Sequence, residues 1–429
     1  MKRRNKTIVG LALFMTVLLV SSLSVYAYTL HCQRGLTQWN REKAYNGYVI
    51  FSAKGLNKTV LVDMNGNVVR IWDGRGQEML PPELANGEKG HVLVKLGSKL
   101  QERNWDNEVV WEVDTNSINI RQHHDWQKLP NGNYLILCRE EIPEDLVPEE
   151  FYGLGIEGKS PIEMTGKMYG DRIVEITPEG EIVWDWHGYE HLDLSKVCGL
   201  ENFKEIRRGD WTHFNAIHYC TNPGYEGMIL ASNRHHNEAI MIDQKTGDIV
   251  WRWGEDILGH QHDVQMIDPG LPGEGNVLLF DNGYHSKYGS GVSAIYEVDP
   301  KTNEIVWSFK GINPGNGTFR SWHISGCNRL PNGNTFITEG EPGRLFEVTP
   351  EGEIVWEYVN PFYYYREGRG IDYSIYRARK VPASWVPEPI ELTPEMIAAA
   401  NLMGQAKAYW DAADALIRQA SELLKYSAK

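Results

Sequence analysis

Histidines cluster in four short stretches of this 429-residue chain. A neutral imidazole can attack an electrophile, carry a proton or bind a transition metal, so several that converge would mark a chemical site. A lone histidine after a turn more commonly bonds a neighbouring backbone group. The stretches are QHHDW (His123, His124), DWTHFNAIHY (His213, His218), GHQHDV (His260, His262) and SWHISG (His323).

Arg234 lies between the second and third of these stretches. It ends the apolar run MILASN and precedes HHNEAIMID, where a hairpin turn is expected. A guanidinium offers a planar fork of donors that matches the oxygens of an oxyanion. The alternative is an ordinary surface charge beside a turn.

Two aspartates directly follow histidines, Asp125 after His124 and Asp263 after His262. Adjacent residues of a strand point to opposite faces, so neither carboxylate is expected to orient the histidine before it. We expect both to make structural hydrogen bonds to the backbone instead.

The segment GLGIEGKS, residues 153–160, matches the spacing of a phosphate-binding loop. Such a loop needs a hydrophobic strand before it and a helix after it. Here EEIPEDLVPEE precedes the match, and Pro161 follows it directly. We therefore predict a glycine-rich surface loop remote from the histidines, and no nucleotide site.

An internal repeat indicates which elements position these residues. A turn with Gly, Asn or Asp leads into a β-branched strand that ends in tryptophan, at Trp72, Trp111, Trp184, Trp251, Trp307 and Trp356. Further upstream in the later units lies a second strand pair, joined in two of them by a Pro-Asn-Gly-Asn turn, so each full unit carries four short strands. The pattern predicts an all-β fold, a six-bladed β-propeller over residues 45–362.

The histidine stretches open the first strand of their units. The innermost strands of a propeller line its central channel, so residues at equivalent starts meet at one end of that channel. The repeat therefore predicts one pocket shared by all four stretches. Tyrosines and tryptophans around its mouth would hold an aromatic ring.

The N-terminus has the pattern of an export signal. Basic residues precede an apolar run within residues 8–27, and a small-residue cleavage site follows. We predict that residues 1–28 form a signal peptide or an uncleaved membrane-anchor helix, with the body exported to the periplasmic or extracytoplasmic side in both cases. The net charge of −14 argues against nucleic acid as a partner. The five cysteines show no CxxC spacing and indicate no pairing.

Two segments follow the last repeat. Residues 363–392 read as an aromatic and basic extension. Residues 393–426 begin with Thr393 and Pro394, a favourable helix start, and carry one apolar stripe at helical spacing. We expect this C-terminal helix to pack on the propeller wall or to contact a protein partner.

The stretches DWTHFNAIHY, ILASNRHHNEAIMID, GHQHDVQMI and NVLLFDNG, with HHD upstream, resemble the bacterial arylsulfotransferases over roughly residues 45–360. The resemblance implies an exported six-bladed propeller. It further implies transfer of a sulfuryl group from an aryl sulfate to a phenol, without a nucleotide donor, a cofactor or a metal.

The resemblance also implies roles for particular residues. It matches His262 to the transiently sulfated histidine, Arg234 to the arginine on the sulfate oxygens, and His124 and His213 to two supporting histidines. We further predict substrate contacts from three residues of the same stretches, Asn215, His260 and His323. The implied chemistry suits these side chains, because an imidazole that attacks sulfur divides one transfer into two easier steps.

The chain departs from known family members in three ways. The short link between the apolar segment and the first blade leaves no room for their N-terminal dimerisation domain. No cysteine pair lies near His262, where they carry a disulfide. The C-terminal helix has no counterpart in them.

Three other functions remain open. Four histidines on a propeller axis could bind an iron or another transition metal, although Arg234 beside them would repel a cation. Repeats such as DQKTGDIVWRW also echo quinoprotein dehydrogenases, but six units are fewer than their eight blades. A non-catalytic, membrane-tethered subunit of a larger assembly would account for the apolar N-terminus, the C-terminal helix and the missing dimerisation domain.

Overall fold

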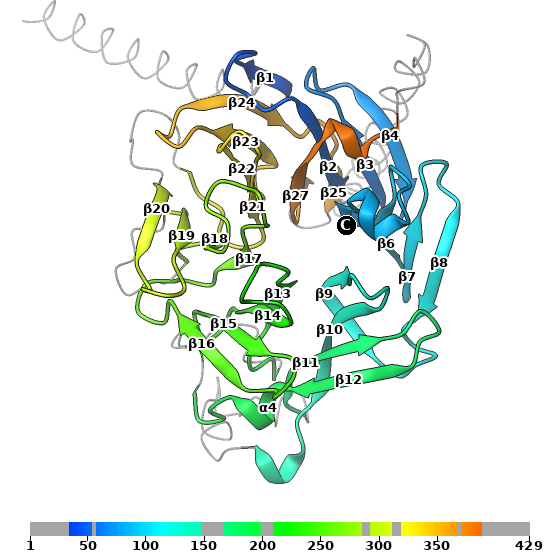
Figure 1. Cartoon of the computed structure of the whole chain (residues 1–429), viewed down its shortest axis with the longest axis vertical. Coiled ribbons are helices and arrows are strands. Elements are labelled where there is room, and N and C mark those ends of the chain that lie inside the picture. The colour runs from blue at the N-terminus through cyan, green and yellow to red at the C-terminus, as the bar shows by residue number, and fades with distance from the viewer. Residues whose placement is uncertain are drawn as a thin grey trace, which may run out of the picture.

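Six sheets surround a central axis in the computed structural model of the chain (Figure 1). The structure describes residues 34–53, 57–147, 167–196, 198, 209–284, 292–310, 319–366 and 370–387. The predicted six-bladed β-propeller is confirmed. The predicted N-terminal helix within residues 1–28, the loop at 153–160 and the C-terminal helix at 393–426 lie outside the described residues.

Each blade is an antiparallel meander that runs from the axis to the rim. From the axis outward, blade 1 contains β27 (Ala378–Pro382), β2 (Gly47–Ala53), β3 (Lys58–Val62) and β4 (Val68–Asp73). Blade 2 contains β5 (Arg75–Met79), β6 (Val92–Leu96), β7 (Lys99–Arg103) and β8 (Val109–Asp114). Blade 3 contains β9 (Arg121–Lys128), β10 (Tyr134–Glu141), β11 (Tyr169–Ile176) and β12 (Ile182–His187).

The other three blades repeat this order. Blade 4 contains β13 (Phe214–Tyr219), β14 (Met228–Asn233), β15 (Glu238–Asp243) and β16 (Ile249–Trp253). Blade 5 contains β17 (His262–Met266), β18 (Val277–Asp281), β19 (Ala294–Val298) and β20 (Ile305–Lys310). Blade 6 contains β21 (Gly326–Arg329), β22 (Thr335–Glu339), β23 (Arg344–Val348), β24 (Ile354–Val359) and, outside them, β1 (Gly35–Trp39).

Short elements fill the connections between strands. They are η1 (Pro82–Ala85), η2 (Glu144–Leu146), α4 (Gly188–His191), η4 (Ala383–Trp385) and the small hairpin of β25 (Tyr364–Arg366) and β26 (Gly370–Asp372). Within the described ranges, no helix is long and apolar enough to span a membrane.

The recurring tryptophans all lie on the outermost repeat strand of their blades, as the repeat predicts. Most of them also link their blade to the next. The indole N–H donates to the neighbouring blade from Trp72 to Asn104 O at 2.8 Å, from Trp111 to Pro178 O at 2.8 Å and from Trp307 to Pro350 O at 2.7 Å. In blade 3 the described donor is Trp186 rather than Trp184.

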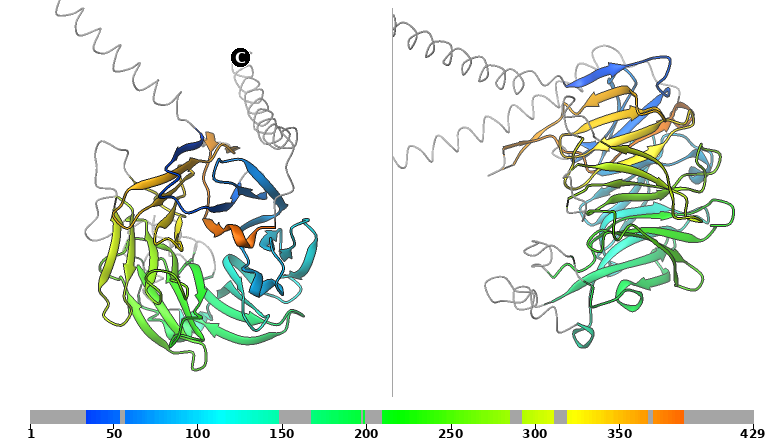
Figure 2. Two further views of the ribbon diagram at one scale, coloured as in Figure 1. Left: turned by 45° about the horizontal axis from the view of Figure 1, so that its top comes forward. Right: turned by 90° about the vertical axis from the view of Figure 1, so that its left-hand side faces the viewer.

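Both ends of the described chain close the ring. Strand β27 pairs with β2, from Gly47 opposite Pro382 to Phe51 opposite Ala378, and β1 pairs with β24 on the rim of blade 6. The two views of Figure 2 show these late and early segments beside one another. The propeller therefore reaches beyond the predicted limits of 45–362, and the predicted extension at 363–392 supplies the inner strand of blade 1.

The core fills the spaces between blades, because alternate residues of each strand face opposite neighbours. In β10, Leu135 and Leu137 pack in the cluster shared with blade 4, whereas Ile136 and Cys138 pack in the cluster shared with blade 2. Apolar strands buried on both faces hold the blades rigid, and this rigidity fixes the positions of side chains on the inner strands.

Candidate active site

The six inner strands are arranged around the axis (Figure 1). Because each of them is the innermost strand of its blade, equivalent positions on them lie at the same level along the central channel. Each of the four histidine stretches places a histidine at a strand start: His123 and His124 in β9, His213 before β13, His260 and His262 at β17, and His323 before β21. His218 of the second stretch lies instead near the end of β13. The predicted location of these stretches at the starts of inner strands is thus confirmed.

Two of the four predicted catalytic residues, His124 and His262, lie beside one tyrosine, and a third, His213, lies beside His124. The rings of His124 and His213 lie 4.8 Å apart between centroids. Tyr376 lies 5.8 Å from His124 and 6.3 Å from His262, and its hydroxyl donates to Asn215 O at 2.8 Å. Tyr376 therefore contributes an aromatic wall between the histidines of blades 3 and 5.

The orientation of His262 is determined by Asn282. Nδ2 of Asn282 donates to the backbone carbonyls of Ser321 and Ile324, at 2.7 and 2.9 Å, so its oxygen must be the atom that faces His262. Nδ1 of His262 lies 2.7 Å from that oxygen and 3.1 Å from His260 O, so Nδ1 carries the proton. The Nε2 atom keeps a lone pair, which accepts the Ile324 N–H at 3.2 Å.

The charge state of His262 follows from its surroundings. Only 3% of the residue is exposed. Burial, and after it the nearby charge of Arg234, lowers the pKa of His262 well below its ordinary value. The imidazole is therefore neutral near pH 7, as a nucleophile must be.

Arg234 is buried beside this histidine, with 6% of its surface exposed. Its Nη1 lies 3.0 Å from Nε2 of His235, whose ring stacks on that of His213 with centroids 5.0 Å apart. Burial, followed by His213 and Arg234, lowers the pKa of His235 well below its ordinary value. Arg234 is thus a fixed cation within the histidine cluster rather than a surface charge.

His213 forms a dyad with Asp210. Its Nδ1 lies 2.6 Å from Oδ2 of Asp210, so Nδ1–H donates and Nε2 is left for proton exchange. Burial alone would raise the pKa of Asp210, but the charge and hydrogen bond of His213 hold it below its ordinary value. The dyad gives His213 the geometry of a general acid or base.

His124 lies in a second chain of contacts. Its Nδ1 is 2.6 Å from Nδ1 of His123, whose Nε2 is 2.9 Å from Oδ1 of Asp171. Burial first, then His213 and His123, lower the pKa of His124 well below its ordinary value. His124 also adopts a backbone φ of 52°, as does His213, a left-handed conformation that is uncommon for residues other than glycine.

The three predicted substrate contacts occupy different positions. His260 is buried behind His262, 3.3 Å from Sγ of Cys198 and stacked on Tyr284. Asn215 is buried and donates to Gln261 O at 2.8 Å, which places its side chain between blades rather than among the catalytic histidines. His323 has a side chain 49% exposed and lies 3.2 Å from Glu341, at the rim of the cluster.

A layer of buried ion pairs lies one step deeper along the inner strands. The aspartates accept backbone N–H groups as predicted, Asp125 from Ile217 at 3.1 Å and Asp263 from Cys327 at 2.8 Å. Both also contact Arg377, each at 3.0 Å, and Asp263 contacts Arg379. The sequence did not suggest these arginines, because β27 was not expected in the propeller.

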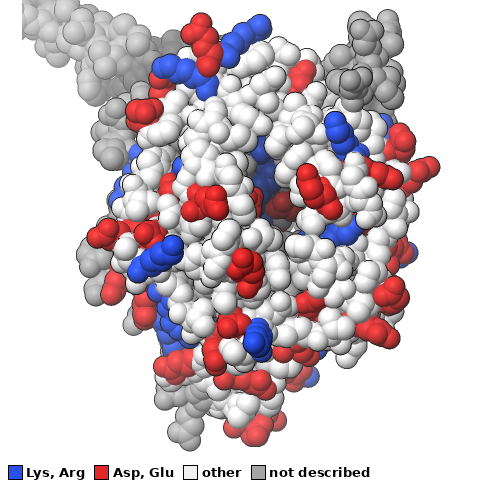
Figure 3. Space-filling view, in the orientation of Figure 1, with Lys and Arg blue, Asp and Glu red and all other residues white. Residues whose placement is uncertain are grey.

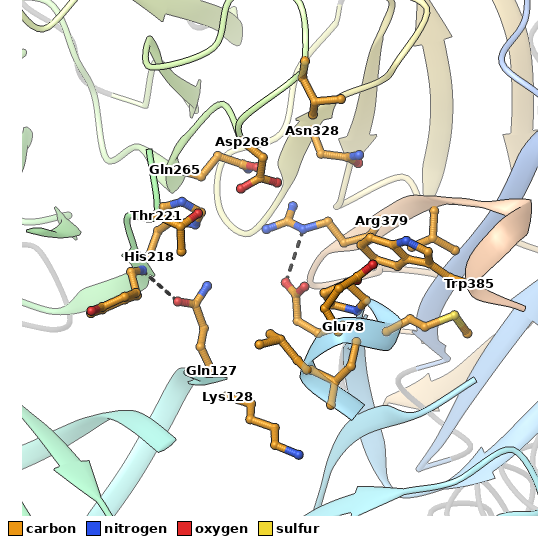
Figure 4. A pocket seen from close by; sticks show the side chains of 18 of the residues that line it. Glu78, Gln127, Lys128, His218, Thr221, Gln265, Asp268, Asn328, Arg379 and Trp385 are labelled. Atoms are coloured by element: carbon orange, nitrogen blue, oxygen red, sulfur yellow. Dashed lines mark hydrogen bonds and ion pairs between the residues drawn. The ribbon is translucent and has the colours of Figure 1, made fainter. Parts of the chain in front are cut away.

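A separate pocket lies beyond this layer, where the inner strands end. It encloses about 600 Å³ and is lined by residues that include Gln127, His218, Gln265, Asn328 and Arg379 (Figure 4). The face turned toward the viewer in Figure 3 is hollowed at its centre, with basic and acidic side chains in the hollow. None of the predicted catalytic residues lines this pocket, because they lie at the opposite ends of the same strands.

The chain shows no arranged metal site in its described part: no group of three or more His, Cys, Asp and Glu residues could hold an ion there. Cys138, Cys198, Cys220 and Cys327 are buried. The candidate site thus consists of imidazoles, a guanidinium and their hydrogen-bond partners.

Sequence reasoning missed four residues of this cluster. Asn282 and Asp210 lie in or beside the quoted stretches, and only the fold shows that they contact His262 and His213. His235 follows Arg234 directly, and the sequence pattern did not distinguish it from the other residues of the expected hairpin turn. Tyr376 gave no signal, since it lies far beyond the last repeat.

These features define a six-bladed propeller whose axis carries a buried histidine cluster with one arginine. The family model for Arylsulfotransferase (ASST) matches residues 32–259, more than half of the chain. The chain belongs to the arylsulfotransferase family. The matched segment includes His124, His213 and Arg234 and ends shortly before His262.

Other comparisons are more distant. The search of curated proteins gave no match. A Bacteroides caccae protein of unknown function has 13% identity, a TM-score of 0.46, and coverage of 79% of this chain and 99% of its own. A virginiamycin B lyase from Staphylococcus aureus has 13% identity, a TM-score of 0.39, and coverage of 77% of this chain and 90% of its own. No functional conclusion follows from similarities at this level.

Proposed function

We propose that the protein transfers a sulfuryl group from an aryl sulfate to a phenolic acceptor through a sulfohistidine at His262. The observation that supports this most directly is the orientation of His262. Its Nδ1–H is committed to Asn282 and its ring is neutral, so Nε2 carries the attacking lone pair.

In the first step, Nε2 of His262 forms a bond to sulfur while the bond between sulfur and the aryl oxygen breaks. The hydrogen bond that the Ile324 N–H donates to Nε2, at 3.2 Å, must break before this attack. Arg234 would bind the sulfate oxygens, on which charge must be balanced as the group is transferred. His124, whose ring lies 4.8 Å from that of His213 between centroids, would support the same oxygens.

In this proposal His213 is the general acid of the first step and the general base of the second. In the first step the imidazolium of His213 gives a proton from Nε2 to the departing phenolate. In the second step the neutral ring takes the proton of the acceptor phenol, whose oxygen attacks sulfur and releases Nε2 of His262. Asp210 holds His213 in the required tautomer throughout.

We further propose that residues 8–27 export the protein and that the reaction takes place on the periplasmic or extracytoplasmic side. Aryl sulfates and phenols are the small-molecule partners in this proposal. The membrane anchor and a protein contact through residues 393–426 belong to the same proposal.

The test is incubation of the full chain with a chromogenic aryl sulfate, with and without an added phenol. The proposal predicts release of coloured phenol that increases with acceptor, and a covalent adduct on His262 when acceptor is omitted. Absence of both release and adduct would refute it.

A second candidate is a non-catalytic propeller, which the contact between Ile324 N–H and His262 Nε2 favours because it occupies the attacking lone pair. An inactive homologue would bind aryl sulfate without releasing phenol. A metal-dependent enzyme is tested separately by metal analysis of the purified protein combined with activity after treatment with a chelator.

A further inference from the structure

The inner strand of blade 2 starts with a cation where blades 3 to 5 carry histidines at or just before the start of theirs. Arg75 begins β5 and lies directly opposite Lys95 of β6 in the strand register. Both residues line a cavity of about 460 Å³ that is also bordered by His124, Ile324 and Tyr376. The two cations therefore share a cavity with His124, and its other end is formed by Ile324 and Tyr376, which contact His262.

The pairing of Arg75 with Lys95 is unfavourable by itself. Like charges directly opposite one another on a sheet repel and destabilise it. Burial, and after it the charge of Arg75, lowers the pKa of Lys95. Such a pair is stabilised when an anion lies between the two charges.

The hydrogen-bond partners of both cations are neutral. Nε of Arg75 donates to Oδ1 of Asn57 at 2.9 Å, and Nζ of Lys95 donates to the backbone oxygen and Oε1 of Gln122 at 3.0 and 2.6 Å. Among the described residues, neither cation forms an ion pair with a carboxylate.

The acids that line the same cavity are bound by two mostly buried arginines, which they share with Asp263. Glu78 accepts a hydrogen bond from Arg379, and Asp125 accepts one from Arg377. Neither arginine lines this cavity, so the arginines contact both acids from outside it. With Arg75 and Lys95, four cations stand against three carboxylates in and around the cavity, which leaves a net positive charge.

Glycines bring the backbones of β5 and β6 close together on both sides of Arg75, whose side chain is exposed. A Cβ on Gly76 would lie 2.2 Å from Leu93 O, and one on Gly74 would lie 3.0 Å from Lys95 O. Only glycines on both sides of Arg75 allow β5 and β6 to approach this closely. The position of Arg75 is therefore built into the strand pair.

The cavity connects the cations with one histidine of the proposed reaction centre. Lys95 contacts Gln122, which precedes His124 by two residues in β9, and all three residues line the cavity. Trp126 and Leu93 supply apolar walls between the two ends of the cavity.

We propose that Arg75 and Lys95 bind a second anionic group, a carboxylate or a sulfate or sulfonate, carried by the aromatic ring of the phenolic acceptor. This inference rests on the proposed function, because it places the acceptor hydroxyl at the histidine cluster. The proposal predicts that phenols with a second, anionic group are better acceptors than phenols without one.

The experiment compares three acceptors with one chromogenic aryl sulfate as donor. They are 4-hydroxyphenylacetate, 4-hydroxyphenylmethanesulfonate and the neutral 4-hydroxyphenylacetamide, in which the methylene group keeps the phenols similar in acidity. Because hydrogen bonds to charged groups are stronger than neutral ones, kcat/KM should favour an anionic acceptor by roughly 10- to 100-fold. Preference for either anion supports the proposal, and equal values for all three overturn it.

Variants test whether these two residues cause the preference. In Arg75→Gln with Lys95→Gln, the ratio of kcat/KM between anionic and neutral acceptors should fall to near one. The ratio is measured within each variant, so a general loss of activity cancels. Lys99→Gln is the matched control, because Lys99 lies in the same blade but pairs with Glu112 outside the cavity. An unchanged ratio in the double variant would overturn the assignment.

A binding measurement separates this proposal from the proposed function. If no acceptor is sulfated, titration of 4-hydroxyphenylacetate into wild type and the double variant still reports on the cavity. Tighter binding to wild type, lost in the double variant, would support the anion site and refute the reaction. Equal weak binding to both would overturn the anion site as well.

Discussion

Nδ1 of His262 donates a hydrogen bond to Oδ1 of Asn282 over 2.7 Å. The amide group of Asn282 cannot reverse, because its nitrogen is engaged by two backbone carbonyls. One side chain thereby decides which nitrogen of His262 carries the proton and which keeps its lone pair.

Replacement of His262 by Asn is expected to abolish phenol release from an aryl sulfate, including the first turnover, because no sulfohistidine can form. The rate should fall on the order of 10⁴-fold or more, as for other covalent nucleophiles. Rapid-mixing kinetics with a chromogenic donor measure this. A full first turnover in the variant would refute the mechanism. His191→Asn, a histidine stacked on Trp186 outside the channel, is the control.

Replacement of Asn282 by Ala should reduce kcat while leaving a sulfohistidine detectable, because the nucleophile remains but its tautomer is no longer selected. A loss of roughly 10²- to 10⁴-fold is expected from the effect of a wrong tautomer in other histidine enzymes. Asn282→Asp provides a second measurement, since a carboxylate would raise the pKa of His262 and shift the pH–rate profile to higher pH. Identical profiles for wild type and the Asp variant would contradict a positioning role.

Arg234→Lys should retain partial activity, because a positive charge remains while the planar fork is lost. We expect kcat/KM to fall roughly 10- to 100-fold, and Arg234→Gln to lose considerably more. Steady-state kinetics with one aryl sulfate compare the two variants. Equal activity of the Lys and Gln variants would show that charge at this position is unimportant.

The folded protein should become less stable as the pH falls below about 6.5, the ordinary histidine value. His124, His235 and His262 have pKa values lowered by burial, so in this range the unfolded chain binds more protons than the folded chain. Each contributes roughly 1 kcal/mol of lost stability per pH unit until its folded pKa is reached. Chemical unfolding at several pH values measures the slope, which His262→Asn should make shallower. A free energy of unfolding that increases as the pH falls would contradict our inference that these three histidines are neutral in the folded protein.

Arg377→Met should destabilise the propeller by roughly 3–5 kcal/mol, because Asp125 and Asp263 would lose a shared buried partner. Lys99→Gln removes a partly exposed pair with Glu112 and should cost less than about 1 kcal/mol. Thermal and chemical unfolding of both variants give the comparison. Equal stabilities would show that the ion layer contributes nothing to ring closure.

The blade number and the location of the histidines could be predicted because both depend on local patterns. Each repeat unit has a tryptophan in its outer strand, and four histidine stretches lie at starts of inner strands. Both features therefore recur along the sequence with the blades. Asp125 and Asp263 were also predicted to accept backbone hydrogen bonds, since strand alternation turns them away from their histidines.

The rest of the site depends on contacts between residues distant in sequence. Arg377 reaches Asp125 across 252 positions, and no periodicity identifies that pair. Arg75 and Lys95 carry no motif, and their opposition follows only from the register of β5 and β6. Local patterns therefore located His262, the proposed nucleophile, but not the groups that orient it or the cations proposed to bind its substrate.

Strand β27 follows Tyr376 and completes blade 1 only after all other described strands have been made. A polypeptide that ends before this point contains every predicted catalytic residue, yet it lacks the aromatic wall, the arginines beneath it and a closed ring. Synthesis from the N-terminus thus leaves the reaction centre incomplete until the last stage. Truncated or C-terminally cleaved chains would carry the histidines but no assembled site, so that the integrity of the C-terminal segment becomes a condition for chemistry.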